Sequence, residues 1–163
     1  MVLDSIGYNQ VEMLMADKDD AVVIYSANEP VQLKKLGQDI VLFKVSDSVE
    51  LVGNGIITNE KTLAENPDLV RAVVEATLRS LDYVMDHPEE SFEISKKYVD
   101  NLADADQEVQ MQVLLNSIEL WRAERMGYSN PQAWENMQRI MVKMGLLTKE
   151  MDLASAFTNQ FIP

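Results

Sequence analysis

Cysteine is absent from this sequence, and histidine occurs once, as His87. Without cysteine the chain has no disulfide, no thiolate nucleophile, no cysteine-ligated zinc and no iron–sulfur cluster. His87 alone supplies neither a catalytic triad nor a histidine-rich metal site. Its position beside Pro88, at a junction between two predicted helices, favours a capping or surface role. We therefore expect no metal site.

Positive charge is also scarce, because 14 Lys and Arg stand against 27 Asp and Glu, for a formal net charge of −13. This balance disfavours nucleic acids and anionic membrane surfaces as partners, since phosphate binding needs clustered basic side chains. No run of about 18 apolar residues is present, so no membrane-spanning helix is expected. The first ten residues lack both a basic region and a long apolar region, and we predict no signal peptide in the chain as it stands.

The common phosphate-loop, nucleophile-elbow and zinc-protease motifs are all missing. The acidic run that begins at Asp17 is no calcium loop, because its sixth and twelfth positions hold Val22 and Asn28 where Gly and Glu are needed. The GNG sequence at 53–55 precedes a predicted strand and has no third glycine, unlike a dinucleotide fingerprint. Two interpretations of 53–55 stay open: a turn or hinge, and a backbone that approaches a ligand.

The composition that remains, 47% apolar and 25% charged residues in a chain of 163, is typical of a globular protein. Short β-branched runs occur in the first part, with helix-length segments at 9–17 and 29–37 between the first three. The runs lie at 2–6, 21–26, 40–45 and 55–58. Strand–helix–strand alternation favours parallel pairing. The sequence thus predicts an α/β protein with a small parallel sheet at 1–58.

Helix signals dominate after residue 59. Asn–Pro pairs at 66–67 and 130–131 read as an N-cap followed by a first helical residue. The first of these helices is predicted to end near His87. A second helix is predicted to begin at Pro88, and a third to run from residues 104–106 to about residue 125. The helix that begins at 130–131 is predicted to end at Gly145, and a last short helix to span 150–157. The loop at 46–54 is the candidate hinge between the sheet and this helix-rich C-terminal part.

Polar and aromatic side chains follow the first two predicted strands. Residues 8–10 (YNQ) follow the first, and 25–30 (YSANEP) follow the second. Ligands of open α/β sheets bind at the carboxyl ends of the strands, so these groups suit a small polar, flat or cationic ligand. The alternative is that Asn9 and Asn28 cap the helices that follow them, with Glu29 in a first helical turn.

Several runs resemble the solute-binding proteins of ABC importers. They are YSANEPVQL at 25–33, GNGIITNEKT at 53–62, ENPDLVRA at 65–72, the segment 127–145, and FTN at 157–159. The chain is most similar to the thiamine-pyrimidine-precursor-binding family, with alkanesulfonate, nitrate and taurine binders as neighbours. The resemblance covers nearly the whole chain.

The resemblance implies a partial periplasmic-binding-protein-like fold of type II, in which two α/β lobes enclose a ligand cleft. Members are about twice as long as this chain, which corresponds to their C-terminal half. Residues 1–50 would be the end of the second α/β lobe, and 51–163 the return strand into the first lobe plus the C-terminal helices. The resemblance also implies a transporter permease as partner and a periplasmic or extracellular, membrane-anchored location.

The resemblance implies a binding site for a small nitrogen-containing molecule such as a thiamine pyrimidine precursor, with no cofactor and no catalysis. Its carboxylate, Glu29, would accept hydrogen bonds from an exocyclic amine, and Tyr8 or Tyr25 would stack on the ring. The implied ligand-binding residues are Tyr8, Asn9, Tyr25, Asn28, Glu29 and Asn54.

Two other interpretations stay open. The chain also resembles eukaryotic pyrimidine synthases that use lysine-bound pyridoxal phosphate, although His87 does not match their histidine. The chain could instead be a structural fragment that self-associates into a homo-oligomer, because its truncated sheet leaves an edge strand and an apolar face uncovered.

Overall fold

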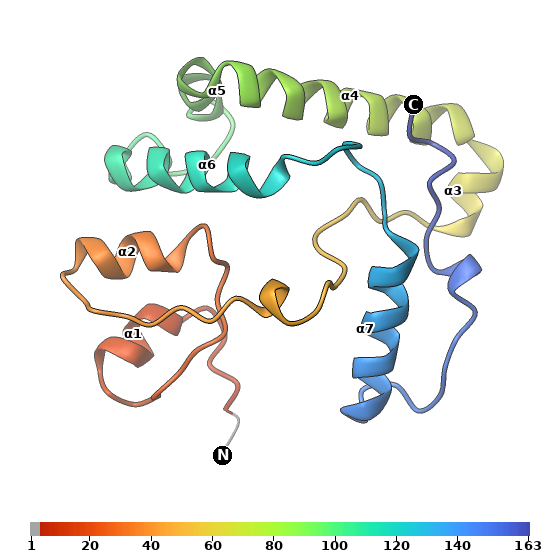
Figure 1. Cartoon of the computed structure of the whole chain (residues 1–163). Coiled ribbons are helices and arrows are strands. Elements are labelled where there is room, and N and C mark those ends of the chain that lie inside the picture. The colour runs from red at the N-terminus through yellow and green to blue at the C-terminus, as the bar shows by residue number, and fades with distance from the viewer. Residues whose placement is uncertain (1–3) are drawn as a thin grey trace. The chain divides into compact units, whose positions relative to one another are not determined.

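The structure, a computed structural model, describes residues 4–163 and shows a chain of helices joined by extended segments (Figure 1). The helices of the described residues are α1 (Gln10–Met15), α2 (Glu29–Lys35), α3 (Glu60–Glu65), α4 (Pro67–Asp86), α5 (Pro88–Ser95), α6 (Gln107–Trp121) and α7 (Pro131–Lys143), with single 3-10 turns η1 (Val45–Asp47) and η2 (Leu153–Ser155).

The predicted α/β fold with a parallel sheet at 1–58 is wrong, because residues 4–163 contain no β-strand. The predicted runs at 21–26, 40–45 and 55–58 form no β-ladder, and the run at 2–6 begins outside the described residues. A strand needs a second backbone beside it to satisfy its N–H and C=O groups, whereas a helix satisfies its own. Strand-forming side chains are consequently left in solvent, such as Val23 at 90% and Ile57 at 94% exposure.

The predicted helix boundaries are largely confirmed, because the local capping chemistry is present. Asn130 accepts a hydrogen bond from the Gln132 backbone N–H at 3.0 Å, with Pro131 as the first helical residue of α7. Asp106 caps α6 through the Val109 N–H at 3.1 Å. The short helix α3 was not predicted, and the 150–157 helix is reduced to η2.

The chain divides into two compact units. The first unit consists of Met1–Leu42 and Tyr83–Arg122 and contains α1, α2, α5 and α6. Within it α2 packs against both α1 and α6, and α5 packs against α6 (Figure 1). Leu33 of α2 is its most completely buried side chain, at 1% exposure. The α2–α6 contact thus forms the centre of this unit.

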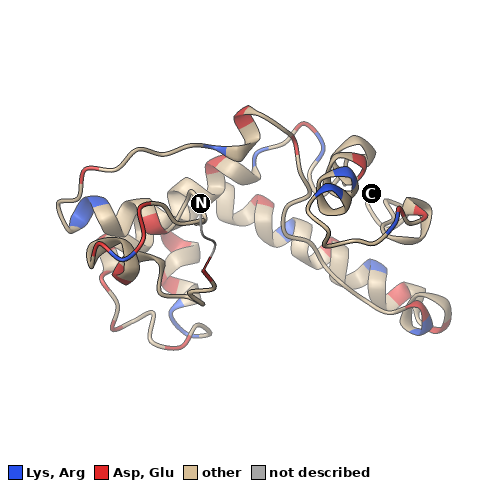
Figure 2. Cartoon of the chain, turned by 90° about the horizontal axis from the view of Figure 1, so that it is seen from below, with Lys and Arg blue, Asp and Glu red and all other residues tan. Residues whose placement is uncertain are grey.

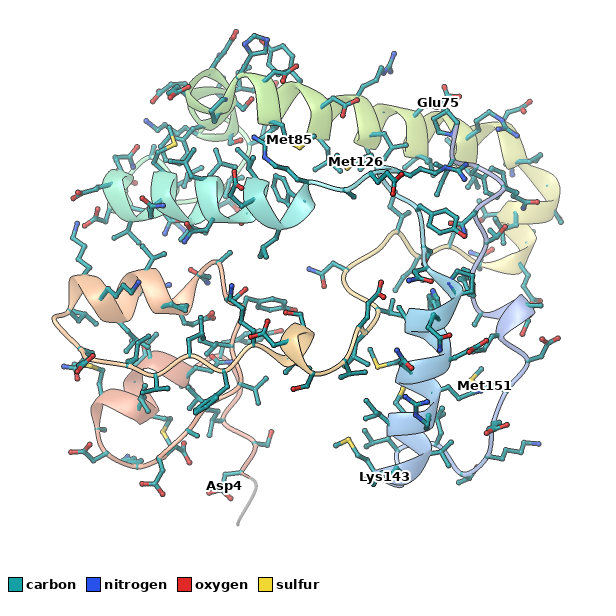
Figure 3. The ribbon with its side chains drawn as sticks, viewed as in Figure 1. Asp4, Glu75, Met85, Met126, Lys143 and Met151 are labelled. Atoms are coloured by element: carbon teal, nitrogen blue, oxygen red, sulfur yellow. The ribbon has the colours of Figure 1, made fainter. Side chains whose placement is uncertain are left out.

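The second unit consists of Phe43–Asp82 and Ala123–Pro163 and contains α3, most of α4, α7 and the C-terminal tail. The tail runs back along α7, where the Met151 backbone N–H donates to the Gln138 side chain at 2.8 Å (Figure 3). Near the start of α7 the Trp134 ring stacks on Phe157, with centroids 4.9 Å apart. The tail therefore covers the helix that precedes it in sequence.

Acidic side chains are spread over the helices of both units rather than gathered in one place (Figure 2). No helix among residues 4–163 combines the length and the apolar character needed to cross a bilayer.

Candidate functional site

The turn that leads into α2 is closed by a carboxylate. One oxygen of Glu29 accepts a hydrogen bond from the backbone N–H of Tyr25 at 3.1 Å, and the Asn28 N–H donates to the Tyr25 carbonyl at 3.0 Å. The Tyr25 side chain itself remains 66% exposed. Glu29 thus fixes the backbone that presents an aromatic ring to solvent. Its other carboxylate oxygen makes no hydrogen bond to any of residues 4–163.

The two asparagines before α1 and α2 occupy N-cap positions, but neither side chain caps its helix. The Asn28 side-chain oxygen instead accepts from the Gln32 amide at 2.8 Å, one helical turn away. The Asn9 amide donates to the Ile6 carbonyl at 3.1 Å. The alternative that these two side chains cap the helices is therefore wrong, because neither makes a capping hydrogen bond. Its other part is confirmed, since Glu29 lies in the first turn of α2.

The five predicted ligand residues before Asn54 all belong to the first unit. Tyr8 and Asn9 immediately precede α1, Tyr25 and Asn28 immediately precede α2, and these two helices pack against each other. Tyr8 is 96% exposed and follows Gly7, whose φ of +63° produces a tight turn. Asn54 lies in the second unit, in an exposed stretch between η1 and α3.

A cluster of charged side chains holds α2, the helix that carries Glu29. Lys35, at the end of α2, pairs with Asp106, and its amine lies 3.4 Å from the Glu108 carboxylate. The hydrogen bond from Lys35 lowers the pKa of Asp106 below its ordinary 3.8, and the Val109 N–H acts in the same direction. The same hydrogen bond raises the pKa of Lys35 above 10.5. This cluster anchors the helix behind the site.

Sequence reasoning missed the Lys35 contact, although it did place a helix start near Asp106. The partners lie 71 residues apart in the chain, and no local pattern of charge or hydropathy connects them. A basic residue in the last turn of a helix is common, so Lys35 by itself did not indicate a contact with a distant carboxylate. The contact was visible only once α2 and α6 were placed together.

Chemically, the predicted ligand residues of the first unit comprise two exposed phenol rings, two side-chain amides and one carboxylate with an unengaged oxygen. These groups recognise a flat ring that bears hydrogen-bond donors, through stacking and through charge-assisted hydrogen bonding. Across residues 4–163 no three potential metal ligands converge.

Comparison with known proteins gives two matches. The profile of the family described as NMT1/THI5 like matches residues 2–91. The riboflavin-binding protein RibY of Chloroflexus aurantiacus is 34% identical over 168 aligned residues. That alignment covers 100% of this chain and 48% of the relative, so the chain spans about half the length of the curated relative it matches. Residues 2–91 include every one of the six predicted ligand positions.

Proposed function

Because the chain belongs to the NMT1/THI5-like family, as the sequence resemblance predicted, we propose that it is part of the substrate-binding component of an ABC importer. The observation that supports this most is the family match itself, which includes all six predicted ligand residues. The proposed role is binding without catalysis. The proposed ligand is a small, flat, nitrogen-containing molecule.

The proposed site uses Tyr25 and Tyr8 for stacking and the unengaged oxygen of Glu29 for a ring amine or ring N–H. The exposure of both rings supports this role, because a stacked ligand needs one open aromatic face. Asn9 and Asn28 would supply further polar contacts, and Asn54 would join them in the longer family protein. The division into lobe ends at 1–50 and 51–163 stays a prediction.

Two ligand classes fit the chemistry. A thiamine pyrimidine precursor carries an exocyclic amine that matches a carboxylate, as the resemblance implied. A flavin matches the relative, which is named as a riboflavin-binding protein. Both are flat heterocycles with donors and acceptors at the ring edge, so the exposed tyrosines serve either one.

Titration separates the two ligands. Stacking on tyrosine is expected to quench riboflavin emission, and calorimetry reports the binding of an aminopyrimidine. We expect weak binding by this chain, in the range of about 1 mM, since it spans half of its relative. Tyr25→Ala should abolish the response, whereas Tyr98→Ala, which removes another exposed tyrosine, should leave it unchanged. No response with either ligand would contradict the proposal.

Glu29→Gln tests the carboxylate separately. The variant keeps an oxygen that can accept the Tyr25 N–H but loses the charge. In the longer family protein, we expect the affinity for an amine-bearing ligand to fall about 5- to 150-fold, with little change in the unfolding midpoint. Unchanged affinity combined with a lower midpoint would assign Glu29 to the turn alone.

In the cell, the partner would be the membrane permease of the importer, and the location would be outside the cytoplasmic membrane, periplasmic or extracellular. These assignments follow from the proposed import function. A homo-oligomer of this chain stays a further prediction.

A further inference from the structure

The segment between η1 and α3 is fastened to α7 at Glu50 (Figure 1). The Glu50 carboxylate accepts a hydrogen bond from the Asn130 side-chain amide at 2.8 Å, and its backbone carbonyl accepts one from the Asn136 amide at 3.0 Å. These partners lie 80 and 86 residues further along the chain, and all three residues belong to the second unit. Residue 50 is thus held through both its side chain and its backbone.

The start of α7, which receives Glu50, is itself held in place. Asn130 uses its side-chain oxygen to cap α7, so one side chain joins the helix start to the Glu50 carboxylate. The residue before it, Ser129, exchanges two hydrogen bonds with the Asn159 side chain, both at 2.9 Å. Glu50 is therefore attached to a part of the second unit that the C-terminal tail already fixes.

Glu50 lies four residues before Asn54, one of the six predicted ligand residues. Leu51 and Val52, which follow Glu50 directly, are half-buried. Four residues of fully extended chain span at most about 14 Å. The attachment at residue 50 therefore limits how far Asn54 can move from the start of α7.

We propose that Glu50 is a positioning residue for Asn54. Because Glu50 fixes the preceding chain before a ligand arrives, less freedom is lost when the Asn54 amide engages the ligand. Glu50 acts through its hydrogen bonds to α7 and not through a ligand contact of its own. The inference rests on the proposed function, in which Asn54 belongs to the ligand site.

Two nitroxide labels measure this restriction without a ligand. The chain has no cysteine, so Gly53→Cys and Lys143→Cys create two unique attachment points. A side chain at position 53 meets no atom within 4 Å, and Lys143 ends α7 in the same unit. Double electron–electron resonance reports the width of the distance distribution between the labels.

Glu50→Ala should widen this distribution about 1.4-fold, because the spread of a flexible chain grows with the square root of its free length. Release lengthens the free chain before residue 53 from three residues to about ten, back to the start of the second unit at Phe43, while α3 still holds the other end. Asp47→Ala is the matched control. It removes the same charge from the same segment, and no hydrogen bond of the described residues joins its side chain to α7. Its width should equal that of the parent.

Exchange of donor and acceptor tests the hydrogen bond itself. Asn130→Asp keeps the capping oxygen but loses the donor and faces Glu50 with a second carboxylate, so it should widen the distribution as Glu50→Ala does. Glu50→Gln alone keeps an accepting oxygen and should leave the width unchanged. Combined with Asn130→Asp it should restore the parent width, because the glutamine amide donates to the new carboxylate.

Circular dichroism verifies that each variant keeps the helical content of the parent. Equal widths in the parent, Glu50→Ala and Asn130→Asp would overturn the inference. A double variant that is as broad as Asn130→Asp alone would also overturn it.

A double-mutant cycle in the longer family protein connects the attachment to binding. Asn54→Ala should weaken ligand affinity by a smaller factor when Glu50→Ala is already present, because an unfixed Asn54 contributes less. Calorimetry with an aminopyrimidine and quenching of riboflavin emission measure the four affinities. Equal factors in both backgrounds would contradict the positioning role and leave the proposed function standing. A parent that binds neither ligand would contradict the proposed function, and with it the role of Asn54, whereas the label widths would still decide whether Glu50 fixes the segment.

Discussion

The two units are stabilised by different kinds of contact. In the first unit, neighbouring helices meet across a buried leucine and a surface cluster of Lys35, Asp106 and Glu108. In the second unit, the C-terminal tail is tied to the region around α7 by stacked rings and a pair of amide hydrogen bonds. The first unit therefore depends on packing between helices, and the second on a tail that covers its own preceding helix.

The same difference explains why the candidate site lies in the first unit. Its rings lie on turns before α1 and α2; α2 packs against α6, and α1 packs against α2. Functional side chains are commonly carried on turns that a packed scaffold positions. The second unit uses its aromatic residues Trp134 and Phe157 to hold the tail, so those rings are engaged with each other.

The largest effect is expected at Leu33, which is 1% exposed in the first unit. Leu33→Ala leaves a cavity at the α2 contacts and should lower the free energy of unfolding by about 2–5 kcal/mol. Leu36→Ala, one helical turn later and 55% exposed, should change it by less than about 1 kcal/mol. Urea denaturation followed by circular dichroism measures both. Equal losses would mean that the α2 contact does not centre the first unit.

Gly127 provides the corresponding test in the second unit. Its φ is +75°, and a Cβ there would lie 2.8 Å from the Leu78 side chain of α4. Gly127→Ala therefore combines backbone strain with an overlap that the Leu78 side chain must move to relieve, and it should cost about 1–3 kcal/mol. Gly145→Ala is the matched control, because φ is +73° but nothing lies within 4 Å of the added atom. It should cost about 1–2 kcal/mol. Similar losses would show that the Leu78 contact adds nothing.

Sequence reasoning reached the elements whose determinants are local. The caps of α6 and α7 and the glycine after α7 are all visible within a few residues. The strand predictions failed because a β-ladder depends on a partner that no local pattern supplies. Val23 and Phe43 have the same β-propensity whether or not a partner strand lies beside them, and both side chains are exposed here.

In the candidate site, too, the contacts between residues close in sequence were easier to predict than those between distant residues. The Tyr25–Glu29 hydrogen bond spans four residues, and the sequence did single out both residues, although it assigned the carboxylate either to a ligand or to a first helical turn and not to the Tyr25 N–H. Lys35 and Asp106 lie 71 residues apart and were not connected. The family resemblance supplied what local chemistry could not, since it named the class of protein from short runs of sequence.

A smaller effect is expected where the tail is fixed. The Asn159 side chain accepts from the Ser129 N–H and donates to the Ser129 carbonyl, both at 2.9 Å. Asn159→Ala removes both bonds and should cost about 1–3 kcal/mol. Gln160→Ala, at the exposed neighbouring position, should be nearly neutral. Limited proteolysis near the C-terminus should also accelerate in the Asn159 variant alone. Unchanged cleavage would mean that the stacked Trp134 and Phe157 rings suffice to hold the tail.

The smallest effect concerns pH and the charged cluster of the first unit. The lowered pKa of Asp106 means that its contribution to stability is present above its ordinary 3.8 and is lost as pH falls through the folded value. The raised pKa of Lys35 gives a contribution that is present below 10.5 and is lost as pH rises through the folded value. Stability should therefore decline at both ends of the pH range.

Asp106→Asn isolates the charge in this cluster, because asparagine still accepts the Val109 N–H and is itself a good N-cap. The unfolding midpoint should depend less on pH at both the acid and the alkaline end. Glu108→Gln should flatten the alkaline end by less, because Glu108 raises the pKa of Lys35 less than Asp106 does. Midpoints measured across pH distinguish these profiles. If Asp106→Asn left the acid limb unchanged, the cluster would contribute nothing there, and the first unit would rest on its apolar packing alone.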